Sequence, residues 1–231
     1  MRPEASCRVV RPAVTIRFAA MTSSTHRPHP DANFAVFDVE TTGFSATGSD
    51  RIIEIAVVLQ SPRGEVLDEY VSLVNPARDA GPTHVHGIDD CELVDAPAFG
   101  DIAGDLIERM RDAVLVGHNV SFDMRFLRAE FGRIGHMVPD LFSVCTVSMA
   151  RKIGMQAPRT LSACCHRYGV DLFNAHSALD DVKATAELMF AMKRHGCDPH
   201  DVAKFQAGGG ALTWPDFAAT GRQHLRAAVT S

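Results

Sequence analysis

The chain contains 231 residues, 46% of them hydrophobic, so it is long and apolar enough to bury a substantial core as one domain with extensions. No run approaches the roughly 20 apolar residues of a membrane-spanning helix, so we expect a soluble protein with no membrane partner. The formal net charge of -5 argues against a protein that coats nucleic acid by general attraction, but an enzyme that collects acidic metal ligands can carry it.

The cysteines indicate a reducing compartment. None of the six has the C-x-x-C spacing of a metal or redox motif, and the adjacent Cys164 and Cys165 suit a buried helix better than a disulfide framework. We therefore expect a cytoplasmic location.

The composition divides the chain into three parts. Residues 1–30 contain five arginines and one glutamate, and they end in a Ser/Thr/Pro/His stretch without periodic pattern. We interpret them as a disordered leader or as sequence upstream of a start at Met21, with a targeting peptide as the alternative. Residues 31–195 carry the patterned sequence of a domain, and residues 196–231 form a weakly patterned tail of unknown role.

Three runs with strand character come first, at residues 35–39, 52–60 and 66–74. The turn sequence SPRGE at 61–65 joins the second run to the third and predicts an antiparallel three-strand meander. A long Pro/Gly/Asp connection at 75–90 follows, to which we assign no regular structure.

Helical patterns and one further strand fill the second half of the domain. The predicted helices lie at 99–111, after the sequence GHN at 117–119, and at 146–152, 160–168 and 178–193, and a short buried strand is predicted at 113–116. This order predicts an α/β fold. Its mixed sheet, a three-strand antiparallel meander plus parallel strands, would be flanked by helices.

Four acids and one histidine stand where predicted elements begin or end. Asp38 and Glu40 end the first strand, and because side chains alternate along a strand, both point to the same face. Asp123 lies in the first turn of the helix after GHN, and His176 and Asp181 flank the start of the last helix. Taken singly, Asp123 and Asp181 are also typical first-turn acids.

The pair Asp38 and Glu40 needs a counter-charge, from arginines or a divalent cation, because like charges on one strand face repel. Hard oxygen ligands suit Mg²⁺ or Mn²⁺ rather than zinc. Two such cations on shared carboxylates would clamp a phosphodiester, one lowering the pKa of an attacking water and the other stabilising the leaving oxygen. His176 would act as the general base for that water.

Three segments resemble the motifs of the DEDDh family of 3'-5' exonucleases, which has a ribonuclease H-like fold. They are FDVETTGF at 37–44, GHNVSFDMRFL at 117–127 and HSALDDVKATAEL at 176–188. Within the family, the resemblance is to the branch of the proofreading (epsilon) subunit of bacterial DNA polymerase III, and it runs over about residues 34–192. Three motifs in this order are far more specific than one short pattern.

The resemblance implies a role for each matching residue. It implies that two divalent cations, Mg²⁺ or Mn²⁺, are bound by four acids: Asp38, Glu40, Asp123 and Asp181. It also implies that His176 is the general base and that Asp180 takes no part, because the pattern H-x-A-x-x-D selects Asp181. Finally, it implies contacts to the terminal nucleotide from a second set of residues: Thr41, Thr42, Gly43, His86, His118, Asn119 and Phe122.

We therefore predict a metal-dependent 3'-5' exonuclease that releases nucleoside monophosphates from single-stranded DNA 3' ends, in proofreading or in DNA repair and clean-up. One alternative is an exoribonuclease of the RNase T or oligoribonuclease kind, because no motif reports contacts to a 2'-OH. Another is a non-catalytic module that binds a polymerase, although such a module would have no reason to retain all five chemical positions. The expected partners are nucleic acid and a DNA polymerase or other replication protein.

Overall fold

The protein is built around one mixed six-stranded sheet. The computed structural model describes residues 28–173, 177–208 and 213–226. The strands are β1 (Phe34–Thr41), β2 (Ile52–Gln60), β3 (Val66–Leu73), β4 (Val114–Gly117), β5 (Leu141–Cys145) and β6 (Lys204–Gln206). They lie in the order β3-β2-β1-β4-β5-β6. The first three are antiparallel, β4 and β5 continue parallel to β1, and β6 returns antiparallel to β5. The predicted meander and parallel strands are therefore confirmed.

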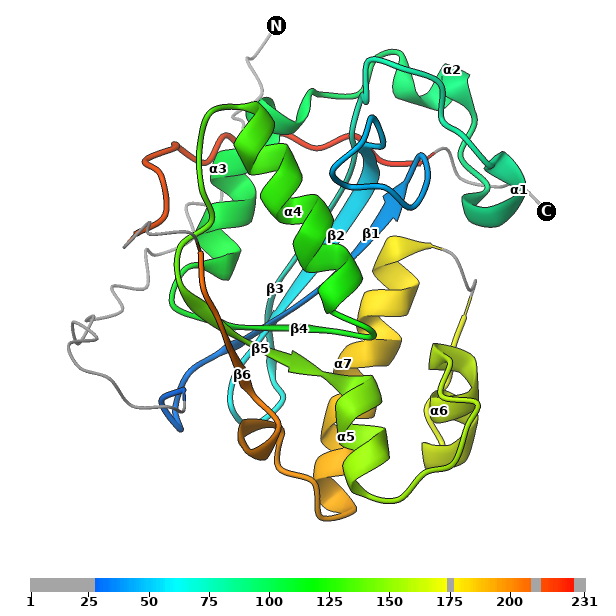
Figure 1. Cartoon of the computed structure of the whole chain (residues 1–231), viewed down its shortest axis with the longest axis vertical. Coiled ribbons are helices and arrows are strands. Elements are labelled where there is room, and N and C mark those ends of the chain that lie inside the picture. Colours follow the sequence, from blue (N-terminus) through cyan, green and yellow to red (C-terminus); the bar gives the residue numbers. More distant parts are fainter. Residues whose placement is uncertain (1–27, 174–176, 209–212, 227–231) are drawn as a thin grey trace, which may run out of the picture.

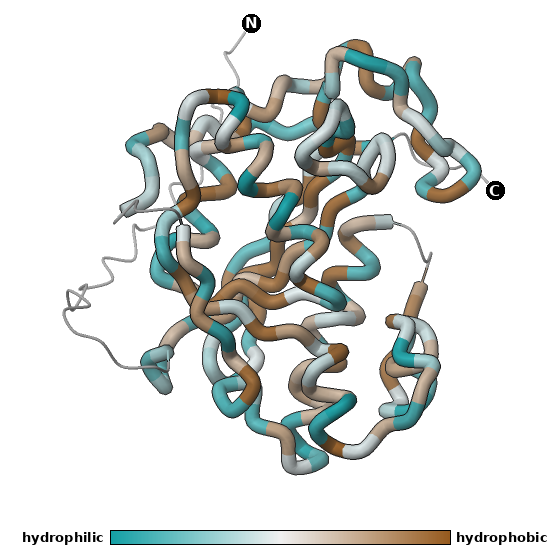
Figure 2. The backbone as a smooth tube through the Cα atoms, viewed as in Figure 1, coloured by the Kyte–Doolittle hydropathy of each residue, from teal (hydrophilic) through white to brown (hydrophobic). Residues whose placement is uncertain are grey.

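Helices cover both faces of this sheet (Figure 1). They are α1 (Thr83–His86), α2 (Asp90–Leu93), α3 (Phe99–Met110), α4 (Ser121–Arg133), α5 (Thr146–Lys152), α6 (Leu161–Tyr168) and α7 (Ala178–Arg194), with a 3-10 turn η1 (Pro199–Asp201). One core lies between the sheet and α3 and α4, and a second lies between the sheet and α5, α6 and α7. Figure 2 shows the hydrophobic residues concentrated in the central strands between these layers.

The structure adds elements that the sequence did not indicate. The helices α1 and α2 have four residues each and lie in the Pro/Gly/Asp connection, and β5 and β6 are also short. Four residues are too few to establish a helical period, so pattern reasoning cannot detect such elements. Within the described ranges, no helix is long and apolar enough to cross a bilayer.

Alternation along β1 sends its side chains to two different cores. Phe37 and Val39 pack in the core beneath α3 and α4, whereas Val36 packs in the core beneath α7. Asp38 and Glu40 continue the series of Val36, so both carboxylates point toward the α7 layer at the carboxyl end of the strand. The strand thus places the two acids where the buried apolar part of this face ends.

Glu130 of α4 fixes the loop between β1 and β2. Its carboxylate is 0% exposed. It accepts hydrogen bonds from Arg51 Nε at 2.7 Å and Nη2 at 2.8 Å, and from the Ile52 N–H at 3.3 Å. Arg133 Nη1 donates to the same carboxylate at 3.2 Å, and its Nη2 donates at 3.0 Å to three carbonyl groups of the loop, those of Ala46, Gly48 and Asp50. One buried acid and two arginines therefore anchor the loop that follows the first motif.

The described residues beyond the predicted domain also pack on this sheet. β6 extends its edge, and the C-terminal segment (residues 213–226, red in Figure 1) runs past α3 toward the strands. The boundary at residue 195 stays a prediction, and most of the predicted leader (1–27) lies outside the described residues.

We expect Glu130→Ala to lower the free energy of unfolding by about 3 kcal/mol, because it removes the buried carboxylate that neutralises Arg51 and Arg133. Urea unfolding followed by circular dichroism measures this change. Glu69→Ala is the control, since it removes an ion pair with Lys183 whose side chains are 41% and 47% exposed; we expect it to cost less than about 1 kcal/mol. Equal losses in the two variants would contradict the anchoring role of Glu130.

Candidate active site

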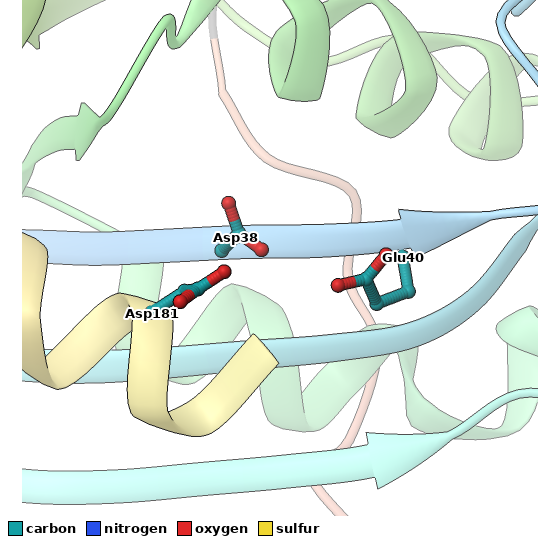
Figure 3. Close-up of side chains that lie close together, drawn as sticks. All are labelled: Asp38, Glu40 and Asp181. Atoms are coloured by element: carbon teal, nitrogen blue, oxygen red, sulfur yellow. The ribbon is translucent and has the colours of Figure 1, made fainter. Parts of the chain in front are cut away.

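Three carboxylates converge between β1 and the start of α7. Asp38, Glu40 and Asp181 each offer one oxygen to a group whose atoms all lie within 4.8 Å of one another. Figure 3 shows the three side chains side by side, two from β1 and one from the first turn of α7. The side chains are half-buried, and the strand that carries Asp38 and Glu40 is fixed in the core. A group of this kind is able to hold a metal ion.

Asp123 lies at the same end of the sheet. β4 pairs in parallel with β1, and α4 begins soon after β4, so the first turn of α4 approaches the carboxyl end of β1. The Asp123 carboxylate is buried, and the backbone groups of Asp123 itself and of Val39 lower its pKa, although burial raises it more. Among the described residues, Asp123 is not part of the group within 4.8 Å, but its negative charge raises the pKa of Asp38.

The site strongly disfavours four negative charges at once. Burial raises the pKa of Asp38 well above its ordinary value, and the charges of Asp123, Glu40 and Asp181 raise it further. Burial also raises the pKa of Glu40 to about 8 and that of Asp123 to about 7. Such carboxylates bind protons at neutral pH unless a cation replaces them. An all-oxygen donor set with this unmet negative charge fits a hard divalent cation such as Mg²⁺ or Mn²⁺.

Glu54 is a further acid at the site, and sequence reasoning missed it. It lies on β2 directly opposite Glu40 and is 2% exposed. Arg226, near the end of the chain, binds it with two donors at 2.9 and 2.7 Å. A glutamate inside the apolar run IIEIAVV is a signal that could have found it, because an acid is rarely buried without a partner.

His176 lies outside the described residues, which resume at Ser177 directly before α7. Its role as the general base therefore stays a prediction from the sequence. Asp180 stands beside Asp181 in the first turn of α7 and is not part of the carboxylate group.

The turn at residues 41–43 is shaped by its own hydroxyl groups. Thr41 Oγ1 donates to the Gly43 carbonyl at 2.7 Å, and Thr42 Oγ1 donates to Asp50 Oδ1 at 3.2 Å and accepts the Arg51 N–H at 3.1 Å. A Cβ at Gly43 would lie 2.5 Å from Asp50 Oδ2, so glycine lets the turn close onto this carboxylate. Contact of these three residues with a nucleotide stays a prediction.

The two histidines predicted to contact substrate already make contacts within the protein: both ring nitrogens of His118 are engaged, whereas His86 uses Nδ1 and its buried Nε2 has no hydrogen-bond partner among the described residues. His118 Nε2 lies 2.9 Å from the Arg159 carbonyl, to which it donates, and its Nδ1 lies 2.8 Å from Thr146 Oγ1. Burial lowers the pKa of His118 and also that of His86. The His86 ring is buried, and its Nδ1 accepts the Ile88 N–H at 3.1 Å. Substrate contact by either residue stays a prediction; for His118 it would need the backbone or the ring face.

Phe122 forms part of an aromatic surface. Its ring lies 6.3 Å from that of Phe44, which is 80% exposed, and Arg125 lies 5.8 Å above the Phe122 ring. A hollow of about 400 Å³ is lined by Phe44, Arg125 and the loop of residues 45–50. Asn119 is exposed and has a φ of 68°, a left-handed conformation that asparagine tolerates well.

Comparison with known proteins identifies the family of this chain. Residues 35–189 match the family described as Exonuclease (RNase_T). DNA polymerase III of the PolC type from Staphylococcus aureus is 35% identical over 165 residues, which cover 70% of this chain and 11% of that polymerase. The chain thus spans about a tenth of the length of the curated relatives it matches.

Two solved structures show the same fold. The nuclease domain of 3'hExo, a DEDDh family member bound to rAMP, has a TM-score of 0.65 at 19% identity, covering 77% of this chain and 98% of that one. E. coli Exonuclease I in complex with a dA16 oligonucleotide has a TM-score of 0.62 at 20% identity, covering 74% and 42%. The predicted ribonuclease H-like fold is confirmed, and the family match shows that this chain belongs to the exonuclease family.

Proposed function

We propose that this exonuclease is metal-dependent, works in the 3'-5' direction on single-stranded DNA ends and releases nucleoside monophosphates. The observation that carries the proposal is the group formed by Asp38, Glu40 and Asp181, whose oxygens lie within 4.8 Å of one another beside the buried Asp123. Carboxylates that repel one another this strongly at the end of a rigid strand are poised to bind cations rather than to stabilise the fold.

In the proposed mechanism, Asp38, Glu40, Asp123 and Asp181 would hold two Mg²⁺ or Mn²⁺ ions. Bound cations would polarise the scissile phosphodiester and lower the pKa of the attacking water. His176 would accept the proton of that water as the general base, as the motif match predicts. The buried part of β1 fixes the geometry of Asp38 and Glu40, so little reorganisation is needed when substrate binds.

The terminal nucleotide would lie along the turn at residues 41–43. The exposed ring of Phe44, which lies beside the partly buried Phe122, offers a face on which a base can stack, and stacking does not require a particular base. Arg125 beside the same hollow would attract a phosphate group. Asn119 on its left-handed turn would contribute a polar side chain from the second motif, and His86 and His118 would shape the surrounding surface.

DNA is the favoured substrate because the 35% identity to a DNA polymerase exceeds the 19% identity to 3'hExo, whose structure holds rAMP. RNA is the second candidate on the strength of that rAMP complex. We also propose a cytoplasmic role in proofreading or repair, with a DNA polymerase as protein partner, from the similarity to the PolC-type enzyme.

Digestion of matched 5'-labelled DNA and RNA oligonucleotides tests activity, direction and substrate together. We expect stepwise shortening of DNA from its 3' end in Mg²⁺ or Mn²⁺ and no shortening in EDTA. Asp38→Asn should lower the rate of DNA shortening by about a hundredfold or more. It removes a proposed metal ligand, whereas loss of a residue that only orients a ligand costs less. Asp180→Asn is the matched control and should keep full activity. Full activity of Asp38→Asn, or activity in EDTA, would contradict the proposed metal-dependent activity.

The pH dependence of stability tests the state of the site without substrate. A carboxyl whose pKa is raised in the folded state stabilises the fold below its ordinary pKa and loses that contribution as the pH rises. In EDTA, the free energy of unfolding should therefore fall between the ordinary pKa of Glu40, 4.5, and its raised value of about 8. Mn²⁺ should reduce this fall, and so should Glu40→Gln, whereas Asp180→Asn should not. A flat or rising profile in EDTA would contradict the crowded-carboxylate account.

A further inference from the structure

The C-terminal segment (residues 213–226) is docked by specific contacts along its length. The Trp214 ring lies 5.6 Å from Phe131, and Phe217 lies 4.9 Å from His136. Farther along, the buried carboxylate of Asp105 accepts hydrogen bonds from three groups: the Thr220 N–H at 3.1 Å, Thr220 Oγ1 at 3.0 Å and the Gly221 N–H at 2.7 Å. Gly104 faces the backbone at Ala218 so closely that a Cβ would not fit. Gly104 and Asp105 of α3 thus hold the middle of the segment in place.

The same segment then joins the edge of the sheet. The Leu73 N–H donates to the His224 carbonyl at 2.7 Å, the His224 N–H donates to Ser72 Oγ at 2.9 Å, and Tyr70 Oη donates to the Arg222 carbonyl at 2.6 Å. These bonds to β3 fix the backbone two residues before Arg226. They thereby place the side chain of Arg226 beside Glu54.

Arg226 binds Glu54 as a two-pronged fork. Nε lies 2.9 Å from Oε1 and Nη2 lies 2.7 Å from Oε2, while Nη1 donates to the His86 carbonyl at 3.0 Å. Both oxygens of Glu54 are therefore engaged, and the carboxylate cannot rotate freely toward Glu40, its cross-strand neighbour. Arginine is suited to this task because its planar group fixes a carboxylate in orientation as well as charge.

Glu54 in turn contacts the start of α7. Its Oε2 accepts the Ala178 N–H at 3.1 Å, whereas Ser177, the residue that precedes the helix, makes no capping bond with its side chain. A carboxylate from β2 therefore caps a helix that is distant in sequence. Asp181 is in this first turn. The chain of contacts runs from Arg226 through Glu54 to the helix turn that carries one of the three clustered carboxylates.

We propose that Arg226 is a positioning residue of the nuclease site: through Glu54 it fixes the first turn of α7 and so places Asp181 against Asp38 and Glu40 for cation binding. The C-terminal segment is then part of the active site and not an appendage. The proposal rests on the proposed metal-dependent activity. Its primary test, however, measures cation binding by the full chain and does not need turnover.

The test is isothermal titration calorimetry, in which Mn²⁺ is added to the 231-residue chain. We expect Arg226→Ala to weaken Mn²⁺ binding by about 10-fold to 100-fold, the usual cost of losing an outer partner of metal ligands. Arg226→Lys should bind Mn²⁺ nearly as weakly as Arg226→Ala, because an ammonium group cannot span both oxygens of Glu54. It also keeps a charge beside Glu54, so it remains informative if Arg226→Ala fails to fold. Arg222→Ala, on the same segment, removes an exposed pair with Asp101 and should bind Mn²⁺ like the wild type.

Double variants test the route of the effect. In a Glu54→Gln background, Arg226→Ala should change Mn²⁺ affinity by less than about twofold, because residues that act through one another are not additive. Gly104→Val should displace the C-terminal segment at a point remote from the clustered carboxylates. On its own it should weaken Mn²⁺ binding, and combined with Arg226→Ala it should add little to the loss. Thermal unfolding of each variant shows that it is folded.

Several results would overturn the proposal. Wild-type affinity in Arg226→Ala would show that the fork does not position the site. Tighter binding, or recovery by Arg226→Lys, would show that Arg226 acts only through its charge. If the wild type binds Mn²⁺ with the predicted variant pattern but shortens no labelled oligonucleotide, the proposed function fails and the positioning role stands. If the wild type is an active nuclease and Arg226→Ala binds Mn²⁺ normally, the positioning role alone fails.

Discussion

Electrostatic repulsion between carboxylates at the end of β1 is the constraint on which the rest of the structure depends. Asp38 and Glu40 share a strand face, Asp181 approaches them from α7, and Asp123 lies close behind, so burial and the neighbouring negative charges raise the pKa of Asp38 and that of Glu40. Only a rigid frame can hold such groups together without a cation. The two apolar cores on either side of the sheet provide that frame.

The surrounding acids differ in how their charge is balanced. Glu130 is neutralised by Arg51 and Arg133, and Glu54 is neutralised by Arg226, so these buried carboxylates stabilise loops and helix ends. The carboxylates of the site are instead crowded by other acids, although Arg226 lowers the pKa of Glu40 to some extent. The protein thus separates structural acids, which have arginine partners, from the acids that are left for a divalent cation.

Much of this arrangement follows from local sequence pattern. Alternation along β1 is enough to place Asp38 and Glu40 on one face, and helical spacing is enough to find α3, α4 and α7. The ion pairs are different, because Arg226 is 172 positions from Glu54 and Arg51 is 79 positions from Glu130. No periodicity links partners at such separations, so only the folded chain reveals them. The hydrogen bonds that occupy both nitrogens of His118 also come from distant residues.

The central claim is that the three clustered carboxylates form a cation site. Anomalous diffraction from crystals of the full chain grown with Mn²⁺ and a nucleoside monophosphate tests it most directly. The account predicts anomalous density between Asp38, Glu40 and Asp181, with the phosphate of the nucleotide on the same ion or ions. Crystals that hold the nucleotide without Mn²⁺ at these carboxylates, or that hold Mn²⁺ only elsewhere on the protein, would contradict it.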